Sequence, residues 1–132
     1  TNGVYEFIRT AGTPAGTLLQ QTGQAMVTNQ ILSATLDLGN SSFVRKRVTV
    51  LFHDSNFSDL AACTFTVEPG QALRTYAMRT FTNRPWADAT FSIYPATVGT
   101  EQWLRLDNVV YQRTPGAPTE GTLCIEPGSS LP

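Results

Sequence analysis

Two carboxylates, one near each end of the chain, could together bind a metal ion. Glu6 lies in an early strand-like segment, and Asp107 interrupts the last long alternation of apolar residues, 103–111. First and last strands lie near each other in many β-sandwiches, so these carboxylates would repel, and burying either one unpaired would cost several kcal/mol. Calcium would remove the repulsion, because it takes hard oxygen ligands and tolerates irregular geometry. The sequence therefore predicts a structural Ca²⁺ between Glu6 and Asp107.

A second group of residues could bind sugar. Trp86 follows Arg84 and Pro85 in a turn, where a large aromatic side chain has no evident reason to face a core. The apolar C–H faces of sugar rings stack on aromatic planes, and the neighbouring Asn83, Arg84 and Asp88 could bind the hydroxyl groups. The alternative is that Trp86 folds back as a lid over one end of the domain.

Two short motifs resemble those of a known group of domains. Residues 2–6 have the form Asn-Gly-x-x-Glu, and residues 103–109 have the form aromatic-x-x-hydrophobic-Asp-Asn-Val. Both are similar to motifs of galactose-binding-like jelly rolls, which include carbohydrate-binding modules of families 4 and 22 and accessory β-domains of secreted bacterial enzymes. In that group the early Glu and the late Asp commonly hold a structural calcium ion. The resemblance, over residues 2–112, thus implies Glu6 and Asp107 as ligands, with Asn2 or backbone carbonyls completing the site.

The resemblance also directs attention to the strand expected at residues 73–81, because modules of this group often bind through an open sheet face. Regular alternation puts Tyr76 and Arg79 on opposite faces of this strand. A surface that combined Arg79 with Arg45, Arg47 and His53 would suit ligand binding, and an exposed face with solvated arginines is the alternative. The candidate ligand-binding residues are Trp86, Arg84, Asn83, Tyr76 and Arg79.

The sequence offers no constellation for catalysis. His53 and Asp54 lie near serines, as a hydrolase triad would require, but adjacent strand residues point to opposite faces. The chain has no Gly-x-Ser-x-Gly motif, and no pair of carboxylates is identifiable for glycoside hydrolysis. Asp54 and Asn56 are better explained as residues that cap their own turn. Two cysteines and one histidine are too few for a four-ligand zinc site without carboxylates.

Two chemical states are possible for Cys63 and Cys124. They could be buried free thiols, or they could form one disulfide, which we favour because the rest of the sequence is typical of a secreted protein. In the chain-entropy description, such a bridge would add about 4 kcal/mol of stability. It would also fix the C-terminal residues to the domain.

Short strands are the elements that would position these residues. Apolar and polar residues alternate, no i, i+3, i+4 pattern is sustained, and clusters of Gly, Pro, Asn and Ser separate the runs. This pattern predicts an all-β fold, a two-sheet antiparallel sandwich, as does the resemblance to jelly rolls. The sandwich is expected to occupy residues 1–113, followed by a Pro/Gly-rich tail or linker at 114–132. The candidate strands are residues 4–8, 17–21, 24–29, 31–38, 43–53, 62–67, 73–81, 90–94 and 103–112, with a weaker one at 122–125.

Composition restricts the partners and the compartment. Only 14% of the 132 residues are charged and the net charge is −1, which gives no electrostatic case for nucleic acid or an anionic membrane. No apolar run approaches the roughly 20 residues of a transmembrane helix. The first residue is Thr1 rather than Met, which indicates a processed chain or an excised domain. Lys46 is the only lysine among many arginines, which favours a bacterial source.

These observations predict a non-catalytic carbohydrate-binding accessory module of a secreted or cell-surface protein, with calcium as its structural cofactor. Its expected partners are a polysaccharide or oligosaccharide and other domains of the same polypeptide. The alternative is a structural or protein-interaction β-sandwich that has no sugar ligand. An exposed Trp or Tyr on an open sheet face would favour sugar binding, whereas a buried Trp86 would favour the structural role.

Overall fold

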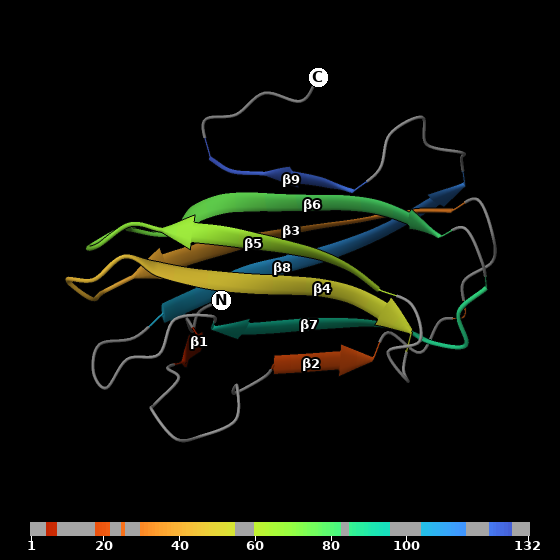
Figure 1. Ribbon diagram of the computed structural model, residues 1–132, viewed down its shortest axis with the longest axis horizontal. Helices are drawn as coiled ribbons and strands as arrows, with labels where there is room; N and C mark the ends of the chain where they lie inside the picture. The colour runs from red at the N-terminus through yellow and green to blue at the C-terminus, as the bar shows by residue number, and fades with distance from the viewer. Residues whose placement is uncertain are drawn as a thin grey trace.

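The computed structural model describes residues 5–7, 18–21, 25, 30–54, 60–82, 85–95, 104–115 and 122–127. These residues form strands and no helix, so the predicted all-β sandwich is confirmed (Figure 1). None of the described segments is a helix that could cross a bilayer. The strands are β1 (Tyr5–Phe7), β2 (Leu18–Gln21), β3 (Gln30–Asn40), β4 (Lys46–Asp54), β5 (Leu60–Val67), β6 (Arg74–Thr82), β7 (Ala89–Pro95), β8 (Leu104–Pro115) and β9 (Leu123–Ile125).

The strands make two antiparallel sheets. One sheet has five strands in the order β1-β8-β3-β6-β9, and the other has four in the order β2-β7-β4-β5. Only β4 and β5 are neighbours both in the sheet and along the chain. Most of the pairing is therefore between distant parts of the chain, and local sequence cannot specify it.

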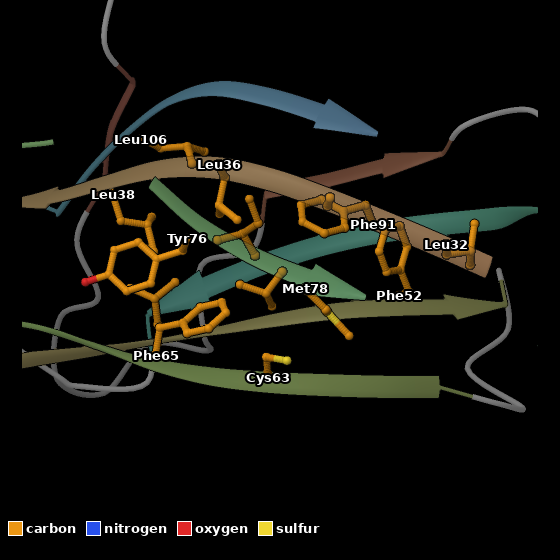
Figure 2. Packing of buried hydrophobic residues seen from close by; sticks show 14 of the residues in the cluster. Leu32, Leu36, Leu38, Phe52, Cys63, Phe65, Tyr76, Met78, Phe91 and Leu106 are labelled. Atoms are coloured by element: carbon orange, nitrogen blue, oxygen red, sulfur yellow. The ribbon is translucent and has the colours of Figure 1, made fainter. Parts of the chain in front are cut away.

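The core lies between the two sheets. Its side chains come from alternate positions of the strands, as the two-residue period of a strand requires. Aromatic rings pack in tilted pairs, with centroids 5.0 Å apart for Phe65 and Tyr76 and 5.0 Å apart for Phe52 and Phe91. Figure 2 shows these rings among the aliphatic side chains that fill the space, which include Leu36, Leu38, Met78 and Leu106.

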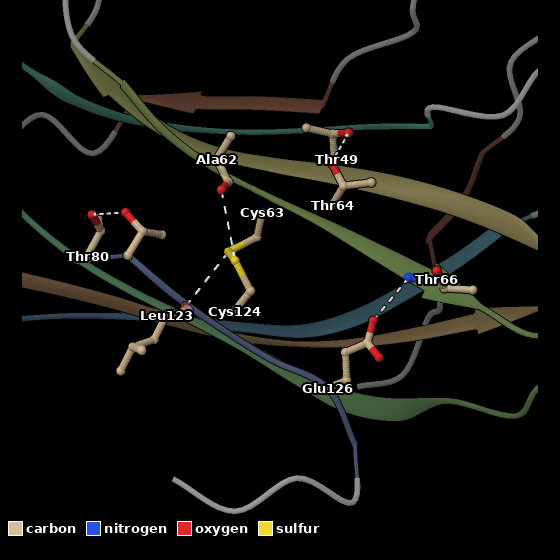
Figure 3. Close-up of a disulfide and its surroundings, with 10 residues drawn as sticks. Thr49, Ala62, Cys63, Thr64, Thr66, Thr80, Leu123, Cys124 and Glu126 are labelled. Carbon is tan, nitrogen blue, oxygen red and sulfur yellow. Dashed lines mark hydrogen bonds between the residues drawn. A yellow bond between two sulfur atoms is a disulfide. The ribbon is translucent and has the colours of Figure 1, made fainter. Parts of the chain in front are cut away.

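A disulfide joins the two sheets (Figure 3). It links Cys63 of β5 to Cys124 of β9, with Cα atoms 5.6 Å apart, so the favoured state of the two cysteines is confirmed. β9 pairs with β6 in the five-stranded sheet, whereas β5 belongs to the four-stranded sheet. The N–H of Thr66 in β5 donates to a carboxylate oxygen of Glu126, just after β9, at 3.4 Å. β9 is therefore held by both sheets.

Some strand boundaries differ from those expected. The sequence predicts a strand over residues 43–53, whereas β4 begins at Lys46 and residues 41–45 form the β3–β4 loop. β8 continues to Pro115, beyond the expected domain boundary after residue 113, and β9 adds a further strand to the same sheet. The strand expected at residues 24–29 lies outside the described residues, apart from Ala25.

Candidate functional site

The two candidate aromatic residues for sugar binding are buried. Trp86 is 3% exposed and Tyr76 is 2% exposed, and both belong to the core between the sheets. The hydroxyl of Tyr76 donates to the carbonyl of Thr66 at 2.9 Å and accepts from the side chain of Gln71 at 3.0 Å. Neither ring has an open face on which a sugar could stack, so the prediction that Trp86 stacks on a sugar ring is wrong, and Tyr76 is not exposed to bind a ligand. The burial of Trp86 agrees with the alternative expectation, in which its side chain folds back over the domain.

The remaining candidates for ligand binding do not form one surface. Arg79 is exposed on the outer face of β6, in the five-stranded sheet, whereas Arg45 lies just before β4 and Arg47 lies in β4, in the four-stranded sheet. His53 is fully buried. The combined face of Arg79 with these three residues is therefore a wrong prediction, because the strands belong to different sheets. The other two candidates, Asn83 and Arg84, lie outside the described residues.

A buried histidine makes the contacts that most resemble a catalytic arrangement. His53 Nε2 lies 2.7 Å from the hydroxyl of Ser92, and its Nδ1 lies 2.6 Å from the main-chain oxygen of Asp54. The Asp54 carboxylate points elsewhere and accepts from the N–H groups of Ala87 and Asp88 at 3.1 and 3.4 Å. His53 and Ser92 are both buried, so no substrate reaches the pair. These contacts fix β4 against β7 and the turn before it.

The predicted metal ligands lie on neighbouring strands. β1 pairs with β8, and the register puts Glu6 opposite Arg105, two positions from Asp107. Asp107 is half-buried rather than buried, so the penalty that motivated a calcium ion is smaller than the sequence suggested. Arg105 also provides a positive charge at the position opposite Glu6. The side chain of Glu6 and all of Asn2 lie outside the described residues.

A third carboxylate, which sequence reasoning missed, stands beside Asp107. Asp37 of β3 is its register partner, and like charges directly opposite each other destabilise a sheet. Neutral donors offset this: Asp37 accepts from the hydroxyl of Thr75 at 2.7 Å and from the side-chain amide of Asn108 at 2.8 Å, and Asp107 accepts from the backbone N–H of Asn108 at 2.9 Å.

A β-bulge brings Asn108 into this position. The β3–β8 register shifts between Thr35 and Asp37, and Asn108 has φ of 51°. Asparagine is one of the few residues that adopt this left-handed conformation readily. The Asp-Asn pair therefore has a structural reason that needs no metal. In the part of the chain that the structure describes, no three His, Cys, Asp or Glu side chains lie close enough to hold a metal ion, so the calcium site stays a prediction that depends on Glu6 and Asn2.

The β3–β4 loop presents the most exposed apolar side chains among the described residues. Phe43 is 85% exposed and its neighbour Val44 is 59% exposed. The loop lies at one end of the sandwich, beside the turn between β5 and β6 (Figure 1, left). Sequence alone predicted a strand here, because Val44 alternates with Arg45 and Arg47 as the residues of a strand would.

Buried polar groups hold this loop in place. The side chain of Asn40 is fully buried; its oxygen accepts from the N–H of Ser42 at 2.9 Å, and its amide donates to the carbonyls of Val44 at 2.8 Å and Val67 at 3.1 Å. The N–H of Val44 donates to the hydroxyl of Ser42 at 2.8 Å. The N–H of Gly70, in the β5–β6 turn, donates to the carbonyl of Ser42 at 2.9 Å.

Three basic residues follow the exposed pair in the sequence. Arg45, Lys46 and Arg47 follow Val44 directly in the chain. The Arg45 guanidinium forms an exposed ion pair with Glu68 at 3.1 Å. Lys46 is 3% exposed, and burial lowers the pKa of its amine below the ordinary value of 10.5. This end of the domain therefore presents an exposed apolar tip next to an exposed ion pair and a buried lysine.

Comparison with protein-family models, with curated proteins and with solved structures gives no match. The contacts described above are therefore the basis for assigning a function.

Proposed function

We propose that this chain is a non-catalytic β-sandwich domain of a secreted protein, whose role is structural or protein-binding rather than sugar-binding. The observation that carries the proposal is the burial of Trp86 and Tyr76 in the core. Trp86 was the candidate for an aromatic plane on which a sugar ring could stack, and Tyr76 was a further candidate for ligand binding. With both rings in the core, the alternative that the sequence left open becomes the better account.

Other observations support the same proposal. The disulfide between Cys63 and Cys124 suits an oxidising compartment. The orders β1-β8-β3-β6 and β2-β7-β4-β5 within the two sheets support a jelly-roll arrangement, a scaffold that hosts many unrelated functions. The buried pair of His53 and Ser92 supports a role without catalysis, because a reacting group must be reached by its substrate.

A glycan array tests this proposal directly. The whole chain is applied with calcium and, separately, with a chelator, after its fold has been verified by circular dichroism. We expect no selective binding in either condition. Selective binding that is lost in Arg79→Ala, the one exposed member of the candidate set among the described residues, would contradict the proposal and would place a sugar site on the outer face of β6. Thr75→Ala, on the same face of β6, is the matched control.

A further inference from the structure

The outer face of the five-stranded sheet carries its charges in a self-complementary pattern. We infer that this face binds a second copy of the chain, and that the two copies are related by a two-fold axis that crosses the strands at a right angle. The inference rests on the protein-binding form of the proposed function, and it names the surface and the partner.

Strand register arranges the outward side chains of β8, β3, β6 and β9 in rows. These strands lie in this order in the sheet (Figure 1), and the residues that alternate with their core positions face outward. The middle of the face is one uncharged row, the central row, which consists of Val110, Thr35, Ala77 and Ile125. The next row on one side contains Arg79, and the next row on the other side contains Asp37 and Asp107.

The central row is open and largely apolar. Val110 is 53% exposed, Thr35 is also exposed, and Ala77 and Ile125 are half-buried. Charged residues lie on either side of this row and not within it. An uncharged centre with a polar border is the usual anatomy of a protein interface.

Opposite charges lie at equal distances from the central row. Arg79 is two residues from Ala77 along β6, and Asp37 is two residues from Thr35 along β3, in the other direction. The two charged residues are therefore about 14 Å apart along the strands, at about 3.4 Å per residue. Within one copy of the chain they are too far apart to form an ion pair.

These charges are not neutralised by the residues that the structure describes. Arg79 forms no ion pair with any of them. The donors to Asp37 and Asp107 are a hydroxyl, a side-chain amide and a backbone N–H, which leave both carboxylates charged. A second arginine of this face, Arg105, is opposite Glu6 in the register of β1 and β8. The face thus has one basic side and one acidic side.

A two-fold axis along the central row would convert this pattern into ion pairs. Rotation about it puts the Arg79 row of each copy over the Asp37 row of the other. Arg79 then stands opposite Thr75 and one strand, about 4.8 Å, from Asp37, and the contact occurs twice by symmetry. An axis along β3 would instead put Asp37 of one copy against Asp37 of the other, which like-charge repulsion disfavours.

The face is also large enough for a specific contact. Four strands about 4.8 Å apart, with nine register pairs between β3 and β6 at about 3.4 Å per residue, give roughly 600 Å² of flat area per copy. Two copies would bury about 1,200 Å², which exceeds the roughly 1,000 Å² expected of a specific interface. Sheets that pack face to face lie about 10 Å apart, a distance that an arginine side chain can bridge.

Charge reversal with sedimentation velocity tests the inference. The whole chain is measured in a chelator, because a cation bound by the carboxylates would mask their charge. The variants are Arg79→Asp, Asp37→Arg, the double variant with both changes, and Thr35→Arg, which puts two arginines against each other at the axis. Arg47→Asp, an exposed arginine of the other sheet, is the matched control. Thermal unfolding verifies that every variant is folded.

We expect the sedimentation coefficient of the wild type to rise between about 1 and 500 μM, because an interface of this size is at the low end of the range. Arg79→Asp, Asp37→Arg and Thr35→Arg should each raise the dissociation constant at least about 10-fold. The double variant should recover most of the association, and Arg47→Asp should not change it.

Three outcomes would overturn the inference. One is a wild type that stays monomeric throughout, which would leave the structural form of the proposed function in place for the glycan array to test. Another is a dimer that the three single variants do not weaken. The third is a double variant that associates no better than Arg79→Asp, because the two residues would then not form a pair.

Chemical crosslinking provides a measurement that does not depend on charge. Thr35→Cys adds one thiol at the axis, and both native cysteines are held in the disulfide. A bis-maleimide that spans about 10 Å, the separation of packed sheets, should join two copies of this variant. Arg47→Cys is the control and should stay uncrosslinked at the same concentration. Equal crosslinking of the two variants would overturn the inference.

Discussion

At the scale of single residues, Tyr76 shows most clearly how the role expected from the sequence differs from the role seen in the structure. Its place on one face of β6 suggested a ligand-binding ring, yet its hydroxyl closes a hydrogen-bonded link from Gln71 to the carbonyl of Thr66. The ring packs against Phe65 in the core. Tyr76 therefore joins the β5–β6 turn to the strand before it.

Removing this hydroxyl should destabilise the domain. In Tyr76→Phe the Thr66 carbonyl loses this donor, and the Gln71 amide loses one of its two acceptors and keeps the Leu38 carbonyl. The expected cost is about 1–2 kcal/mol in the free energy of unfolding. Urea denaturation would measure the loss. Tyr94→Phe, at a half-buried tyrosine of β7, is the control and should change stability by less than about 0.5 kcal/mol. An equal effect of the two substitutions would contradict the role assigned to the Tyr76 hydroxyl.

Alkaline pH should reduce the contribution of Tyr76 to the stability of the folded domain. Burial raises the pKa of Tyr76 above its ordinary 10.0, and the carboxylates of Glu126 and Glu68 add to this, while the hydrogen bond from Gln71 and the charge of Arg74 oppose it. The folded state then keeps the proton longer than the unfolded state, so this contribution to stability is complete below pH 10 and is lost as the pH rises through the folded pKa. The wild type should therefore lose stability more steeply than Tyr76→Phe above pH 10. Parallel curves would contradict this assignment.

The difference in stability between the wild type and Tyr76→Phe does not include the other groups that titrate at alkaline pH. Burial also raises the pKa of Tyr111, which adds a loss of the same sign. Burial lowers the pKa of Lys46, so stability from that residue rises with pH up to 10.5, the opposite sign. Both residues are present in the wild type and in Tyr76→Phe, and their contributions cancel in the difference.

At the scale of elements, the strands that carry Glu6 and Asp107 were expected to lie near each other, and β1 pairs with β8. Whether this arrangement holds a metal ion can be tested. The calcium hypothesis requires Glu6 and Asp107, and the structure adds Asp37 as the register partner of Asp107. An ion that binds only the folded state stabilises it by about 2.7 kcal/mol at a hundred times its Kd. We expect excess chelator to lower the thermal midpoint of calcium-loaded protein by several degrees.

The variants decide which residues hold the ion. Glu6→Ala and Asp107→Ala should abolish the chelator shift, and Asp37→Ala tests the added carboxylate. Asp88→Ala, an acidic residue on the turn before β7, is the control and should retain the shift. A wild-type midpoint that is the same with calcium and with chelator would remove the site and leave the bulge at Asn108 as the reason for the Asp-Asn pair.

Strand faces could be predicted from sequence, but the assignment of faces to sheets could not. Alternation puts Val48, Val50 and Phe52 on one face of β4, and in the structure all three side chains are buried. The same alternation could not show that Arg47 and Arg79 belong to different sheets, because sheet membership depends on pairing between distant strands. The β3–β4 loop was missed for a related reason: the buried side chain of Asn40 replaces strand pairing there, and such a competition between side chain and backbone is invisible in an apolar pattern.

At the scale of the whole molecule, the Cys63–Cys124 disulfide should be a major source of stability. It closes a loop with a sequence separation of 61 residues, for which the chain-entropy description gives about 4 kcal/mol. Cys124→Ser avoids a cavity, because Cys124 is exposed whereas Cys63 is buried. We expect this variant and the reduced wild type to lose a similar amount of stability in urea denaturation.

Hydrogen exchange would localise the effect of breaking the bridge. β9 has three residues and pairs only with β6, so its amides should lose protection on reduction, while those of β4 should keep most of theirs. Reductant should have no further effect on Cys124→Ser, which serves as the control. Unchanged protection of β9 in the reduced wild type would show that hydrogen bonding alone holds this strand.

The bridge also determines how the domain would respond to mechanical load. A pull on the C-terminal end reaches Cys124 and passes through the sulfur atoms directly into β5, so the 61-residue loop between the cysteines is excluded from the path of the force. An extended chain spans about 3.4 Å per residue, so roughly 200 Å of chain cannot be drawn out while the bond is intact. In a chain of domains under tension, the intact disulfide would limit how far this domain can extend. A reducing agent would break the disulfide and allow the residues between the two cysteines to extend as well.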